Sequence, residues 1–166
     1  MGTRIAVPAS RMGNTAERLA DDSIRRIAPQ GVLASLLKKL LKLERECSIE
    51  KGPFTVFGLF LREEAPNRWD LVVSADWLDR DDRSLLVYLA RKMTALLASS
   101  ERIMVARIAI MSPKDDFIQT VLDSVRIEHG LEQLGQGEFG QVSIERAFVI
   151  TSLRRTRAKR ATRKIR

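Results

Sequence analysis

Residues 54–61 constrain the fold more than any other part of this chain of 166 residues. Their sequence, Phe-Thr-Val-Phe-Gly-Leu-Phe-Leu, is apolar on both of the alternating sides that a strand would present. A strand of this kind is buried on both faces, so it lies centrally in a sheet. A second strand is predicted over 69–75. The short polar loop between the two strands, with Pro66-Asn67 as its turn, predicts a hairpin.

Two helices are predicted before this hairpin. Asn14 provides an N-cap for the first helix, and Glu17 stands at capping-box spacing from it. The second helix carries a leucine-rich seam about two heptads long, and Gly52-Pro53 ends it. Because a seam of this length is too short to hold a dimer alone, we expect most of it to face the sheet. Its apolar residues are Leu33, Leu36, Leu37, Leu40, Leu41, Leu43 and Cys47.

The second half of the chain continues the alternation of helices and strands. The pattern predicts a helix from Asp79, a strand over 103–111, a helix with Ser112 as its N-cap and Pro113 at its first position, and a last strand over 142–150. The order α-α-β-β-α-β-α-β indicates an α/β (α+β) fold, with a mixed sheet of four to five strands and helices packed on it.

The chain divides into a domain and two flanking segments. Residues 1–13 are expected to be loosely ordered, 14–153 to form a single domain, and 154–166 to form a disordered basic tail. The tail holds eight of the 29 Lys and Arg residues and no acid, so the remaining 21 basic residues are balanced by 21 acids. The basic residues of the tail are Arg154, Arg155, Arg157, Lys159, Arg160, Arg163, Lys164 and Arg166.

The composition of the tail indicates how it would bind. Lys and Arg without acids suit the neutralisation of phosphates, so these eight residues are the predicted nucleic-acid contacts. The tail has no aromatic residue that could stack on a base, and binding should therefore be independent of sequence. The single cysteine, Cys47, and the absence of a signal peptide or a long apolar run favour a cytoplasmic location without a membrane partner.

Acidic residues around the second strand offer an alternative function. Asp70 stands at the start of this strand, and Asp76 and Asp79 follow its end, where ligands bind in open α/β sheets. Together these three carboxylates could hold Mg²⁺ for phosphodiester hydrolysis by a metal-dependent nuclease. The competing interpretation is structural: Asp79 is an ordinary N-cap, and Asp81 and Asp82 then lie in the first turn of the helix, where its dipole favours anions.

Two other patterns have stronger structural interpretations. Gly135, Gly137 and Gly140 follow the spacing G-x-G-x-x-G and resemble the glycine-rich loop of protein kinases over nine residues. Only 24 residues follow Val142, and they contain no catalytic kinase motif, so a loop between two short strands is the better interpretation. Cys47 on the seam is interpreted as a buried thiol, and His129 beside Gly130 as a turn residue, rather than as a catalytic pair.

The sequence therefore predicts a non-enzymatic interaction module with no catalytic residue and no cofactor. Its body would bind protein, either a second copy of itself or a larger complex, while the basic tail contacts nucleic acid without sequence specificity. Two alternatives stay open. One is the metal-dependent nuclease that uses Asp70, Asp76 and Asp79, and the other is a pure protein-binding adaptor with an inert tail.

Overall fold

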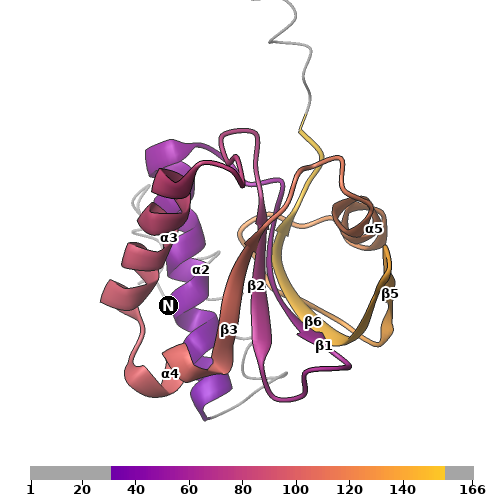
Figure 1. The fold of residues 1–166 in the computed structure, drawn as a ribbon, viewed down its shortest axis with the longest axis horizontal. Helices are drawn as coiled ribbons and strands as arrows, with labels where there is room; N and C mark the ends of the chain where they lie inside the picture. The colour runs from indigo at the N-terminus through magenta and orange to yellow at the C-terminus, as the bar shows by residue number, and fades with distance from the viewer. Residues whose placement is uncertain (1–30, 156–166) are drawn as a thin grey trace, which may run out of the picture.

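The computed structural model describes residues 31–155. The predicted first helix, the segment 1–13 and the tail from residue 156 onward lie outside the described residues. The described chain forms three layers: a central sheet, three helices on one of its faces, and a single helix on the other (Figure 1). The helices are α2 (Val32–Lys51), α3 (Arg83–Leu96), α4 (Ser99–Met104) and α5 (Asp116–Ser124).

The sheet is mixed, which confirms the predicted fold class, and it has six strands where four to five were predicted. Its order is β3-β2-β1-β6-β4, and the short strand β5 pairs with β6 beside this path. The pair β2 and β3 is parallel, whereas β1 is antiparallel to both of its neighbours. The strands are β1 (Val56–Arg62), β2 (Trp69–Ser74), β3 (Val105–Ile110), β4 (Glu132–Leu134), β5 (Gly137–Phe139) and β6 (Val142–Ser152).

β1 lies at the centre of the sheet, as its apolar composition predicts. β1 is flanked by β2 and β6, and its first six residues are buried. Successive side chains point to opposite faces, so the strand contributes to two separate cores. Phe57 and Leu59 pack in the core under α2 and α3. Phe60 belongs to the other core, where its ring lies 5.0 Å from that of Phe117 in α5. The predicted hairpin to β2 is confirmed.

α2 packs on one face of the sheet and supplies most of the buried helical residues of the core on that side. Leu36, Leu40, Leu43 and Cys47 of the predicted seam are fully buried. The helix ends at Gly52, whose φ of 131° lies in the region that favours glycine. The seam therefore faces the sheet, as predicted, and is not available for self-association.

Two predicted boundaries around α3 are wrong. The N-cap of α3 is Asp82, whose side chain accepts a hydrogen bond from the Ser84 amide, whereas Asp79 closes an earlier turn by accepting from the Asp81 amide at 2.9 Å. The strand predicted from residue 103 starts only at Val105, because the short helix α4 precedes it. Ile103 lies in α4 and is 71% exposed, which explains why its apolar side chain misled the prediction.

The start of α5 also differs from the prediction. Asp115, and not Ser112, caps this helix by accepting a hydrogen bond from the Phe117 amide at 2.9 Å. The hydroxyl of Ser112 accepts instead from the Lys114 amide, within a turn that precedes the helix. Both residues are good caps, and the packing of Phe117 in the core decides between them.

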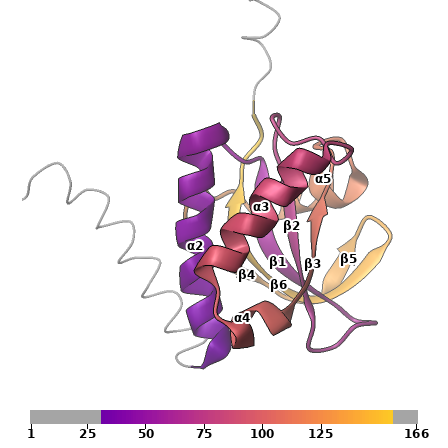
Figure 2. The ribbon, with the colours of Figure 1, turned by 60° about the vertical axis from the view of Figure 1, so that its left-hand side comes forward.

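Figure 2 shows how α2 and α3 lie side by side, with α4 below them. Glu101 of α4 joins the layer by accepting hydrogen bonds from the Ser35 hydroxyl and from Lys39 Nζ, the latter at 2.8 Å. Burial alone would raise the pKa of Glu101, but hydrogen bonds from Lys39, Ser35 and the Ala98 amide outweigh it and lower the pKa to about 2. Among the helices described, none has the length and apolarity that a bilayer span requires.

Candidate interaction surface

α3 buries far less of its surface than α2 does. Its buried residues are Leu89 and Met93, which face the sheet, whereas α2 buries seven residues. On the outer side of α3, Leu86 is 36% exposed and Val87 is 42% exposed. In a helix buried inside a fold, neighbouring elements would cover apolar side chains such as these. The outer side of α3 is therefore apolar surface that the described chain leaves uncovered.

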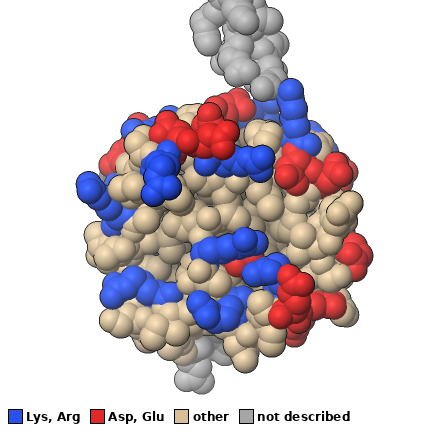
Figure 3. Space-filling model, in the orientation of Figure 1, with Lys and Arg blue, Asp and Glu red and all other residues tan. Residues whose placement is uncertain are grey.

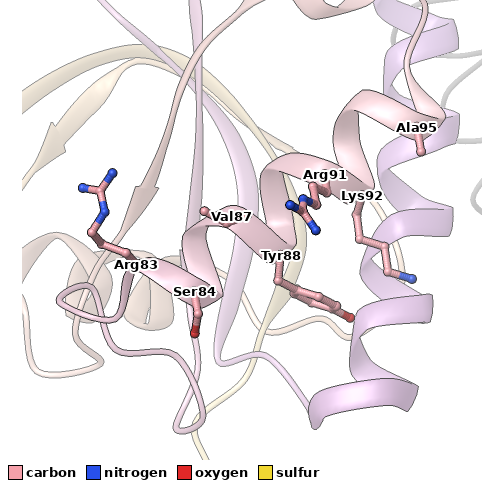
Figure 4. Close-up of a pocket in the computed structure, with 7 residues that line it drawn as sticks. All are labelled: Arg83, Ser84, Val87, Tyr88, Arg91, Lys92 and Ala95. Atoms are coloured by element: carbon pink, nitrogen blue, oxygen red, sulfur yellow. The ribbon is translucent and has the colours of Figure 1, made fainter.

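A shallow depression of about 700 Å³ runs along this outer side (Figure 4). Val87, Ala95 and the ring of Tyr88 give it apolar walls, while Arg83 and Arg91 stand along it with no side-chain hydrogen bond or ion pair among residues 31–155. An apolar surface with guanidinium groups beside it is typical of a surface that binds another protein. The residues that line it are Arg83, Ser84, Val87, Tyr88, Arg91, Lys92 and Ala95.

One wall of the depression is held rigid from α2. In Figure 4 Tyr88 and Lys92 extend from α3 toward α2. The Tyr88 hydroxyl donates to Glu50 Oε1 at 2.5 Å, and Lys92 Nζ donates to the other oxygen at 3.0 Å. Burial and the hydrogen bond to Glu50 raise the pKa of Tyr88, so the hydroxyl stays protonated and keeps donating. The contacts of Tyr88 and Lys92 with Glu50 therefore join α3 to α2 and fix this wall of the depression.

The open edge of β3 lies beside α3. β3 ends the strand order of the sheet, and among residues 31–155 only β2 pairs with it. α3 packs directly on β3. Tyr88 and Lys92 face α2, so helical periodicity places Leu86 and Ala90 on the opposite side of α3, toward this edge. We call β3 and the exposed side chains of α3 the β3–α3 face; its members on α3 are Arg83, Leu86, Val87, Ala90 and Arg91.

The formally neutral body is polarised. α2 and α3 together carry eight Lys and Arg residues against three Glu, whereas residues 111–150 carry three against seven Asp and Glu. In Figure 3 the lower left of this view, over the helices, shows Lys and Arg, and the right side, over α5 and β5, shows mainly Asp and Glu. An overall balance of charge thus conceals two surfaces of opposite sign, which the sequence totals did not reveal.

The first two arginines assigned to the tail contact the folded body. Arg155 donates from Nε and Nη2 to the carbonyl oxygen of Phe54, at 3.0 and 2.6 Å, and from Nη2 to Glu128 at 2.8 Å. Arg154 pairs with Asp123 and donates to Gln119. These guanidinium groups anchor the root of the tail to the domain. The other six basic residues predicted to contact nucleic acid lie outside the described residues.

The three carboxylates considered for a metal site are not brought together. Asp70 is buried and pairs with Arg62, Nε to Oδ2 at 2.8 Å, and with Arg107 at 3.3 Å. About 13 Å of strand separates it from the end of β2, beyond which Asp76 and Asp79 follow. Among residues 31–155 there is no group of three or more His, Cys, Asp or Glu side chains arranged to hold a metal ion.

A buried carboxylate that the sequence pattern did not reveal belongs to the inner side of α2. Glu44 is fully buried, accepts a hydrogen bond from the Thr151 hydroxyl at 2.8 Å, and lies 2.7 Å from Nδ1 of His129. Its partners are 85 and 107 positions away in the chain, so no local pattern could have joined them. The only sequence signal was a Glu between two buried seam residues. The hydrogen bond to Glu44 raises the pKa of His129.

His129 and Cys47 belong to different environments. His129 occupies a turn, as predicted, with a φ of 55°, and its ring contacts Glu44. Cys47 is fully buried on the seam, where burial raises the pKa of its thiol. A buried thiol with a raised pKa is a poor nucleophile. The chemistry of this region is that of an internal hydrogen-bonded network.

The glycine-rich segment forms the short strand β5 and its turns. Gly140 makes the turn into β6 with a φ of 65°, and Phe139 before it packs on Phe117 of α5. A strand, and not a helix, follows these glycines, so no helix N-terminus is available for a phosphate. Comparison of the chain with protein-family models, with curated proteins and with solved structures gave no match.

Proposed function

We propose that this chain is a non-enzymatic interaction module. Its folded body binds protein through the β3–α3 face, and its basic tail contacts nucleic acid without sequence preference. The observation that carries the proposal is the outer side of α3, where exposed Leu86 and Val87 lie beside arginines that have no partner among residues 31–155. Core-forming residues left uncovered on a domain otherwise well packed indicate a surface that a partner covers.

The side-chain clusters of the body support a binding role rather than catalysis. Glu44 with His129, Tyr88 with Glu50, and Asp70 with its two arginines each join separate elements of the fold. In each of these clusters the charged group or hydroxyl makes its contacts within the fold. Along the β3–α3 face, the side chains of α3 that have no partner among residues 31–155 are guanidinium groups and apolar side chains, which bind but do not transfer protons at neutral pH.

The tail is suited to a polyanion. Beyond Arg155, which is fixed to the body, six basic residues and no acid follow. Each phosphate that they neutralise releases counterions, which gives a log–log salt slope of about −0.9 per contact on duplex DNA. Engagement of four to six of them predicts a slope of about −4 to −5, a loss of several hundred-fold between about 50 and 200 mM salt.

The test replaces the six tail residues with glutamine in the full chain and measures affinity by fluorescence anisotropy on a labelled duplex and a labelled single strand. These residues are Arg157, Lys159, Arg160, Arg163, Lys164 and Arg166. We expect binding to be lost. A matched control makes the same change of charge at six exposed residues of the body outside the β3–α3 face: Lys38, Lys42, Arg68, Arg80, Lys114 and Arg126.

The control should retain most of the affinity, since the tail carries the predicted contacts. Equal binding by the tail variant and the parent would show that the tail is not the nucleic-acid site. If the parent itself does not bind at low salt, the nucleic-acid half of the proposal is wrong, and the adaptor with an inert tail takes its place.

A further inference from the structure

We infer that the open edge of β3 pairs with the same edge of a second copy of this chain, in an antiparallel and two-fold symmetric arrangement. The inference rests on the proposed protein-binding role of the β3–α3 face and names the partner of that face. Two-fold pairing of this kind would join the two six-stranded sheets into one continuous sheet.

The backbone of β3 has hydrogen-bonding groups that face outward. The amide of Met111 donates to the carbonyl oxygen of Val73 in β2 at 2.9 Å. Amide and carbonyl groups of successive residues point to opposite sides of a strand, so those of Ile108 and Ile110 point away from β2. Both groups of both residues therefore face the open edge.

The stretch Ile108–Ile110 of β3 lacks the features that keep edge strands apart, since the one register shift of β3 against β2 lies earlier, between Val105 and Arg107. Edges in monomeric proteins are protected by proline, by bulges or by charged side chains. The six residues of β3 contain no proline, and their one charge, Arg107, already pairs with Asp70 of the same chain at 3.3 Å. The remaining side chains are Val, Ala and Ile, which favour strand pairing. The outer part of β3 is thus compatible with a further strand.

A second copy fits this edge in a specific register. Pairing Ile108 of one copy with Ile110 of the other forms two hydrogen-bonded residue pairs about the two-fold axis. The same register sets Ala109 opposite the second Ala109, where small side chains allow close approach, and keeps the two Arg107 side chains out of direct opposition. Every outward-facing amide and carbonyl group of Ile108 and Ile110 then has a partner.

The side of α3 next to the open edge of β3 also complements the same side of a second copy. α3 packs on β3, and its exposed Leu86 and Ala90 lie toward the edge. In a two-fold pair the α3 helices of both copies flank the new strand pairing on the same face, where these apolar side chains can meet. The second copy therefore offers both the strand that β3 lacks and apolar cover for α3.

The experiment measures the mass of the full chain by light scattering after size exclusion, at concentrations from about 1 to 200 µM. The parent should reach twice the chain mass of 18.8 kDa. Ile108→Pro removes an outward amide and should be monomeric, because proline on the open side of an edge strand is tolerated by the fold but not by a pairing strand. Ile108→Ala is the matched control: it shortens the same side chain, keeps the amide, and should remain dimeric.

A second variant keeps the test valid if Ile108→Pro does not fold. Ala90→Arg changes an exposed helix residue and should raise the dimer dissociation constant about tenfold or more, through steric and charge repulsion across the axis. A parent that is monomeric throughout would overturn the inference, as would a dimer that neither variant weakens. If the parent is monomeric but binds nucleic acid, the proposed role of the tail holds, and a second copy is not the partner of the β3–α3 face.

Discussion

α2 and α3 are both leucine-rich helices on the same face of the sheet, yet they have different roles. Leu36, Leu37 and Leu40 of α2 are fully buried, whereas Leu86 and Val87 of α3 are substantially exposed. α2 is hydrogen-bonded through Glu44 to Thr151 of β6, an inner strand of the sheet, whereas α3 packs on the edge strand β3. Similar apolar patterns thus serve the core in one helix and form a surface in the other, because position in the layer decides which side chains are covered.

The largest effect should come from a charge in the α2 seam. Leu40 is fully buried, so Leu40→Asp would place an unpaired carboxylate in the core. The expected loss of unfolding free energy is about 4 kcal/mol or more, a large part of the total stability of a domain of this size. Urea denaturation followed by circular dichroism measures it. A variant that stays as stable as the parent would mean that α2, like α3, has an uncovered side.

A smaller effect concerns Glu44, the buried carboxylate of α2, and its partner His129. The pKa of His129 is raised in the folded state by Glu44, so the folded protein holds the proton more tightly than the unfolded chain does. Its stabilising contribution is complete below about pH 6.5 and is lost as the pH rises through the raised pKa of the folded state. The unfolding free energy should therefore fall with rising pH above this value.

His129→Asn provides the comparison, because asparagine tolerates the φ of 55° at this position and does not titrate. Its unfolding free energy should depend less on pH than that of the parent over the same range. Charged groups near the ring that also shape the profile are Glu128 and Arg45. Identical pH profiles for parent and variant would show that the contact with Glu44 does not contribute to stability.

Much of the fold could be predicted because its signals are local. The run over 54–61 predicted a central strand, the polar loop around Pro66-Asn67 predicted the hairpin, and the seam with Gly52 predicted the buried α2 and its end. In each case neighbouring residues carry the whole pattern, and the tertiary structure preserves it.

The remaining features depend on contacts between distant residues. Asp79 and Asp82 are equally good caps in the sequence, and the loop before α3 is fixed by Trp77, whose ring donates to the Gly52 carbonyl at 2.8 Å, 25 positions away. The network of Glu44 joins residues on α2, the turn before β4, and β6. The candidate surface was missed for the same reason, since only the sheet order shows that β3 is an edge and that α3 has an open side.

The most direct test of the contrast between the two helices is the urea unfolding of Val87→Asp, at a concentration where the parent is monomeric. Val87 is 42% exposed on the outer side of α3, so the carboxylate remains in water. The predicted change in unfolding free energy is within about 0.5 kcal/mol of the parent, as for other surface substitutions. A loss of about 3 kcal/mol or more would show that Val87 is part of the core, and would contradict the assignment of α3 as an interaction surface.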